Sequence, residues 1–82
     1  MKSKQKKKAT SPDMIALGKR MKELRIKAGH KSHETFAYQF EINRVLYGDY
    51  EAGKGNITYK NLMKIIRGLG VSVKEFFSEG FE

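Results

Sequence analysis

His30, His33 and Glu34 are the side chains whose types and spacing come closest to a metal-binding group. A closed zinc site needs four ligands at characteristic spacings, and these three residues straddle the expected start of a helix. The chain also contains no cysteine, so thiolate ligands are excluded. We therefore expect no metal ion and no other cofactor.

Enzymatic chemistry is not indicated either. The lack of cysteine removes thiol nucleophiles and disulfides, and no other nucleophile stands with a base at a recognisable spacing. The sequence Gly53-Lys54-Gly55 is too short for a phosphate-binding P-loop and lacks the Gly-Lys-Ser/Thr ending. We expect a protein that is not an enzyme, and the lack of disulfides fits a reducing cytoplasm.

The charge points to a different kind of activity. The 82 residues carry 17 Lys and Arg against 9 Asp and Glu, a formal net charge of +8. A short chain this basic favours a polyanionic partner, most commonly nucleic acid. No apolar run approaches the roughly 20 residues that span a bilayer, and no signal-peptide pattern follows the basic N-terminus. We therefore expect neither a membrane segment nor a secretory signal.

The positive charge is concentrated at the N-terminus. Residues 1–10 contain no acidic residue and five lysines, which are Lys2, Lys4, Lys6, Lys7 and Lys8. A segment with so little apolar surface and so much like charge is predicted to be a disordered tail. It either binds phosphate by charge alone or serves only to solubilise the protein. Residues 11–82 are then the folded domain.

The folded part is predicted to begin at Ser11-Pro12, where serine caps a helix and proline occupies its first position. Apolar residues recur at three- and four-residue spacing up to Gly29, which ends the helix. This predicts a buried face made of Met14, Leu17, Met21, Leu24 and Ala28. The opposite, exposed face should hold Lys19, Arg20, Lys22 and Glu23.

Four later segments repeat this order of cap and helix, with caps at Ser32, Asn43, Thr58 and Ser72. Ser72 and Glu75 have the spacing of a capping box. No alternating strand pattern competes with the helical one. The expected inward-facing residues of these segments are Phe36, Ala37, Phe40, Tyr47, Tyr50, Leu62, Ile65, Ile66, Leu69 and Phe76. The sequence predicts a compact all-α domain of five short helices.

Several segments, in order, resemble the Cro/C1-type helix-turn-helix domain, the XRE family of transcriptional regulators. Residues 17–25 are similar to the family's first helix, and residues 32–37 to its Ser-Gln-Glu-x-Leu-Ala segment. Residues 43–53 resemble its recognition helix with the closing Glu-x-Gly, and residues 62–77 its C-terminal pattern. The resemblance implies a lambda-repressor-like fold. It also implies sequence-specific binding of double-stranded DNA, with a recognition helix at about 44–52 in the major groove.

The resemblance identifies the residues expected to contact DNA at the two helix starts. Ser32 and His33 open the second helix, and His33 replaces the glutamine that contacts a phosphate in the family. Asn43 and Arg44 open the recognition helix. Asparagine can read adenine, while arginine can read guanine or bind only phosphate.

Farther along the recognition helix, this chain departs from the polar pattern of the family. Val45 can contact a thymine methyl group, and Asp49 can accept a hydrogen bond from cytosine or instead repel phosphate. Gly48 weakens the helix but permits a close backbone approach to DNA. Lys54 and Asn56, in the following loop, are candidate phosphate contacts.

Two further expectations concern structure rather than base reading. In the family, the positions of Arg25 and Glu51 form an ion pair that ties the first helix to the end of the third. Such proteins commonly bind DNA as dimers, and we expect Phe76 in the core with Phe77 or Phe81 available for a homodimer contact, unless all three close the core.

A second function remains open at this level. The apolar Val45 and Leu46, together with Asp49, also suit a helix-turn-helix that serves as a protein-interaction module, antitoxin-like or an assembly partner, with weak or non-specific DNA binding. The net charge of +8 argues for DNA instead.

Overall fold

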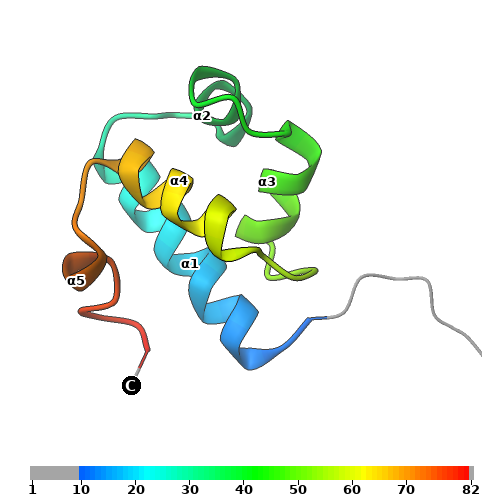
Figure 1. Ribbon diagram of the computed structural model, residues 1–82, viewed down its shortest axis with the longest axis vertical. Helices are drawn as coiled ribbons and strands as arrows, with labels where there is room; N and C mark the ends of the chain where they lie inside the picture. The colour runs from blue at the N-terminus through cyan, green and yellow to red at the C-terminus, as the bar shows by residue number, and fades with distance from the viewer. Residues whose placement is uncertain (1–9, 82) are drawn as a thin grey trace, which may run out of the picture.

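Five helices, joined by short loops, make up the computed structural model, which describes residues 10–81 (Figure 1). In chain order they are α1 (Pro12–Lys27), α2 (His33–Gln39), α3 (Arg44–Glu51), α4 (Tyr59–Leu69) and α5 (Val73–Phe76). Among residues 10–81 there is no β-strand, and extended pairing is limited to one antiparallel bridge between Thr10 and Lys54. The expected all-α, five-helix architecture is confirmed.

The helices begin where the sequence places them because each cap side chain satisfies a free backbone N–H of the first turn. In every case the cap oxygen accepts a hydrogen bond from the N–H three residues later, at 2.9–3.1 Å. The five caps are Ser11, Ser32, Asn43, Thr58 and Ser72. Glycines with positive φ follow α1, α3 and α4, as expected for helix ends.

One hydrophobic core lies between the helices. The helix α1 packs against α2, α3 and α4, and Figure 1 shows α4 crossing it. The large side chains that are completely buried are Met21, Phe36, Tyr47, Tyr50, Ile65, Ile66 and Phe76. Three expected core residues differ: Ala28 is exposed, and Phe40 and Leu62 are half-buried, although both pack against the core. Ala28 and Phe40 stand at C-cap positions, where the chain leaves the helix and its buried face.

Gly18 allows α1 and α3 to approach closely. A β-carbon at Gly18 would lie 2.2 Å from the carbonyl oxygen of Tyr50 and 2.7 Å from that of Glu51. Both neighbours are backbone atoms of α3, so they cannot be displaced by a side-chain rotation. The closeness of this crossing sets the position of α3 on the domain.

The expectation that Arg20 is a surface residue is wrong. Its side chain is only 5% exposed, and its Nε and Nη2 each donate a 2.7 Å hydrogen bond, to the carbonyls of Phe76 and Glu75 respectively. The last carbonyls of a helix have no partner within the helix, so the guanidinium supplies the missing donors. Arg20 Nη1 also pairs with the exposed Glu23 at 3.0 Å. Arg20 thereby holds the short α5 against α1.

The predicted disorder of the lysine-rich tail falls on residues 1–9, which lie outside the described residues. Thr10, the last residue of the predicted tail, is described, and its bridge to Lys54 joins the start of the domain to the loop after α3. Within residues 10–81, no helix has the length and apolar character needed to cross a membrane.

Candidate nucleic-acid interface

The helices α2 and α3 form a helix-turn-helix. They pack against each other, Ala37 of α2 is completely buried, and the N–H of Ile42 donates to the Ala37 carbonyl at 2.8 Å. In the turn between them, Glu41 adopts a left-handed conformation with φ of 58°. Lys64 of α4 donates a 2.8 Å hydrogen bond to the Glu41 carbonyl, so this turn is also attached to the next helix.

The helix α3 presents one face outward. Its Tyr47 and Tyr50 point into the core and are at most 1% exposed, whereas Arg44 is exposed and Val45 is 65% exposed. Figure 1 shows α3 at the edge of the molecule, with no described segment on its outer side. The first turn of the expected recognition helix is therefore accessible to a double helix.

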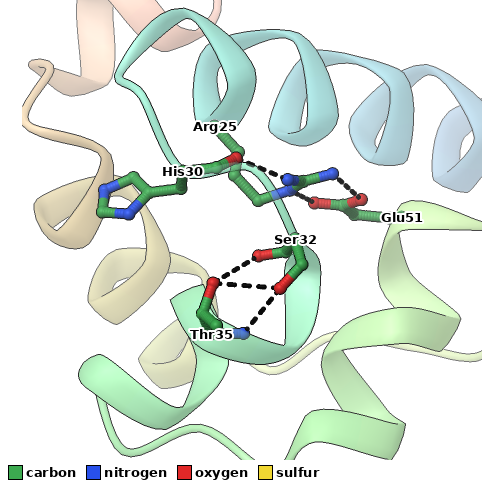
Figure 2. A network of polar contacts seen from close by, with 5 residues as sticks. All are labelled: Arg25, His30, Ser32, Thr35 and Glu51. Atoms are coloured by element: carbon green, nitrogen blue, oxygen red, sulfur yellow. Dashed lines mark hydrogen bonds and ion pairs between the residues drawn. The ribbon is translucent and has the colours of Figure 1, made fainter.

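Polar residues at the two helix starts serve first as caps. The Oδ1 of Asn43 accepts from the N–H of Leu46 at 2.9 Å, so the acceptor needed for two-point reading of adenine is already engaged. The Oγ of Ser32 accepts from the Thr35 N–H at 3.1 Å and lies 3.0 Å from the Thr35 hydroxyl (Figure 2). These contacts favour structural roles for Asn43 and Ser32.

His33 and Gly48 meet between α2 and α3. The His33 ring is half-buried, and a β-carbon at Gly48 would lie 3.1 Å from its Nε2 atom. Gly48 is therefore next to a side chain of α2, an arrangement that the sequence does not indicate. His30 lies elsewhere, edge-on to Phe36 and Phe40. The two histidines are thus built into different parts of the domain.

The loop after α3 holds the remaining expected contacts. Lys54 and Asn56 are exposed, and the Lys54 N–H donates to the Asp49 carbonyl at 2.8 Å. Together with the bridge to Thr10, this bond fixes the backbone from which the Lys54 side chain extends. Asp49 itself is half-buried on α3.

Tyr38 is a surface residue that the sequence analysis did not single out. It is 87% exposed and lines a hollow of about 430 Å³ together with Glu34, Thr35, Ile42 and Arg44. Its hydroxyl is of the kind that binds phosphate oxygens. The sequence contained a signal, because Tyr38 lies off the helical face defined by Phe36, Ala37 and Phe40.

The recognition helix is fixed at its C-terminal end by Arg25 and Glu51. Arg25 Nε donates to Glu51 Oε2 at 2.7 Å and Nη2 donates to Oε1 at 3.2 Å. Arg25 Nη1 donates to the His30 carbonyl at 2.6 Å (Figure 2). The side chains are only 5% and 9% exposed. The hydrogen bonds to Glu51 raise the pKa of Arg25 above its already high value, so Arg25 stays charged.

Tyr47 lies beside this pair. Burial raises the pKa of its phenol, and the neighbouring Glu51 raises it further. Among residues 10–81 its hydroxyl has no hydrogen-bond partner, whereas the Tyr50 hydroxyl accepts from Asn61 at 3.2 Å. Tyr47 is therefore a neutral, tightly packed side chain rather than an acid or base.

The C-terminal aromatic residues divide between core and surface. Phe76 is completely buried, Phe81 is half-buried and packs against the core, and Phe77 is 40% exposed. The rings of Phe77 and Phe81 contact each other with centroids 4.9 Å apart and planes inclined by 53°. Val73 of α5, 48% exposed, is a further apolar residue at this end of the domain.

Comparison with known proteins places this arrangement in a family. The model of the Helix-turn-helix family matches residues 21–76. The control protein C.MunI of Mycoplasma sp is 40% identical over 65 residues, which cover 79% of this chain and 88% of the relative.

Solved structures give the same relationship. The restriction-modification controller protein C.AhdI from Aeromonas hydrophila is 31% identical, with a TM-score of 0.74 over 82% of this chain and 100% of that one. The controller protein C.Esp1396I, solved as a tetramer with its natural 35 base-pair operator, is 29% identical. Its TM-score is 0.71, over 79% of this chain and 84% of that chain. The Cro/C1-type resemblance is confirmed, and the chain belongs to the helix-turn-helix family, in the group of restriction-modification controller proteins.

Proposed function

We propose that this protein is a sequence-specific, double-stranded DNA-binding transcription regulator that controls restriction-modification genes. The observation that carries the proposal is the exposed first turn of α3, with Arg44 and Val45 outward, on a helix anchored by the Arg25–Glu51 pair. The relationship to C.Esp1396I, solved on its operator, supports the same mode of binding. Such a role requires access to the chromosome, so we place the protein in the cytoplasm.

In this proposal Arg44 reads guanine, because its exposed guanidinium is the donor fork nearest the start of the recognition helix. Val45 contacts a thymine methyl group. His33, Lys54 and Asn56 bind phosphates, and the exposed Tyr38 joins them. Asp49 accepts from cytosine, while Ser32 and Asn43 cap the two helices and Gly48 lies next to His33.

The lysine-rich tail adds affinity without specificity. Thr10, which follows residues 1–9 in the sequence, is bridged to Lys54 of the loop that we assign to phosphate. Each neutralised phosphate contributes about 0.9 to the slope of log affinity against log salt. Deleting residues 1–9 should lower this slope by up to about 4.5, since the segment holds five lysines, and should weaken all duplexes similarly.

We further propose that the protein binds as a homodimer through the C-terminal end, with Phe77 in the contact and Phe81 supporting it. Two-fold operators present half-sites about 34 Å apart, which suits two copies of one recognition helix. The exposed Phe77 and Val73 offer the apolar surface that such a contact needs.

The experiment is selection of bound sequences from random duplex DNA, followed by fluorescence anisotropy at roughly 50 and 200 mM salt. The selected duplex should bind more tightly than an unrelated duplex of equal length, and both should weaken steeply with salt. Arg44→Ala should reduce this discrimination, whereas the matched control Arg67→Ala, an exposed arginine of α4, should not. Absence of duplex binding at low salt would refute the proposal.

The exposure of Val45 also favours a second candidate, a protein-interaction module that uses the outer face of α3. Apolar recognition would survive high salt, because screening weakens charge interactions and leaves apolar burial intact. The test uses 1 M salt, roughly ten times the concentration at which duplex binding weakens. A protein partner that stays bound at this concentration, and no longer binds the Val45→Lys variant, would support this alternative over DNA.

A further inference from the structure

The imidazole of His33 lies in tight contact with the position that a β-carbon of residue 48 would take. Measured from an ideal β-carbon built on Gly48, the nearest atoms are His33 Nε2 at 3.1 Å, Cδ2 at 3.3 Å and Cε1 at 3.9 Å. The ring also lies beside Tyr47, with centroids 6.5 Å apart and planes inclined by 33°. A polar ring from α2 is thus placed on the surface of α3.

This placement matters because α3 has few polar groups on the same stretch. Val45 is apolar and 65% exposed, Leu46 is half-buried, and Gly48 has no side chain. A neutral imidazole carries one N–H donor and one acceptor nitrogen, so His33 supplies side-chain hydrogen-bonding capacity that Val45, Leu46 and Gly48 lack.

We propose that Gly48 is a positioning residue that acts on DNA through His33: the missing β-carbon lets the imidazole lie on the recognition helix, from where it donates to a backbone phosphate. The inference rests on the proposed function and adds a reason why residue 48 is a glycine. Gly48 then makes no direct contact with DNA. Its role is to set the position of a donor that belongs to the neighbouring helix.

The geometry predicts opposite effects of one substitution on folding and on binding. A methyl group at Gly48 requires the His33 ring to move by a few tenths of an ångström, and a half-buried side chain at a helix start can do so. Alanine also favours the helix over glycine. Gly48→Ala should therefore fold with an unchanged or raised Tm, while it moves the imidazole away from its phosphate.

The test is a double-mutant cycle, measured as duplex affinity by fluorescence anisotropy with Tm recorded for every variant. Gly48→Ala and His33→Ala should each weaken binding about ten-fold, the value of one hydrogen bond to a charged group. The double variant should bind no more weakly than His33→Ala alone. His33→Gln, whose flexible amide can donate around a methyl group, should retain most affinity both with Gly48 and with Gly48→Ala.

Two outcomes would overturn the inference while the unmodified protein binds DNA. One is that Gly48→Ala lowers duplex affinity by the same factor with His33 present and in the His33→Ala background. This would indicate that DNA approaches the backbone at Gly48 directly. The other is a loss on the selected duplex without a similar loss on an unrelated one, because a phosphate contact acts on both. Failure of the unmodified protein to bind any duplex would overturn the proposed function, and this inference with it.

Discussion

Substitution Arg25→Ala tests how the recognition helix is held in place. The guanidinium is 5% exposed and makes three hydrogen bonds, two to Glu51 and one to the His30 carbonyl, at 2.6–3.2 Å. Its removal leaves a carboxylate that is 9% exposed without its counter-ion, which typically costs about 3–5 kcal/mol. In a domain of this size each kcal/mol lowers Tm by about 4–8 °C, so even 3 kcal/mol should lower Tm by about 12–24 °C.

The measurement is thermal unfolding followed by circular dichroism, with Arg67→Ala as the matched control. Arg67 is an exposed arginine of α4, and its loss should change stability by less than about 0.5 kcal/mol. In the Arg25→Ala background, Glu51→Gln should recover part of the loss, because it removes the uncompensated charge. If Arg25→Ala melts at the temperature of the unmodified protein, the pair does not hold α3 to α1 and the reasoning fails.

Three further predictions follow from the packing. Gly18→Ala should lower the free energy of unfolding by about 3 kcal/mol or more, since its β-carbon would lie 2.2 Å from the Tyr50 carbonyl oxygen. A Tm within about 2 °C of that of the unmodified protein, a change of less than about 1 kcal/mol, would contradict the close crossing of α1 and α3. The raised pKa of Tyr47 means that the folded state keeps a proton that the unfolded chain releases above about pH 10, so stability should fall as pH rises past that value. In urea unfolding, the free energy of unfolding should fall less between pH 8 and pH 11 for Tyr47→Phe than for the unmodified protein. An identical fall in both proteins would exclude Tyr47 as the cause. Phe77→Ser should weaken the proposed homodimer about ten-fold in analytical ultracentrifugation, and unchanged association would remove Phe77 from the contact.

Local signals in the sequence are sufficient to predict the helices. A cap requires only a polar side chain and an N–H three residues later, and all five predicted caps make this bond. The inward positions of Tyr47 and Tyr50 follow equally from helical spacing. Properties that depend on a single helix turn can therefore be predicted from the residues of that turn.

Contacts between distant segments cannot be predicted in this way. Arg20 follows the spacing of an exposed residue, and its burial depends on carbonyls of α5 that lie 55 and 56 residues later. From the sequence, Gly48 is interpreted as a position where the backbone can approach DNA closely. Residue spacing does not show that the His33 ring already contacts this position. The Arg25–Glu51 pair is predicted only because family resemblance supplies the long-range information that spacing lacks.

The bridge between Thr10 and Lys54 has a practical consequence for handling the protein. Nine residues span at most about 30 Å, so an affinity tag fused ahead of Met1 is attached within about that distance of the Lys54 loop. A histidine-rich tag there would alter measured affinities and salt slopes. A tag after Glu82 begins one residue from Phe81, beside the surface assigned to self-association. Binding and oligomerisation are therefore best measured on material from which the tag has been cleaved.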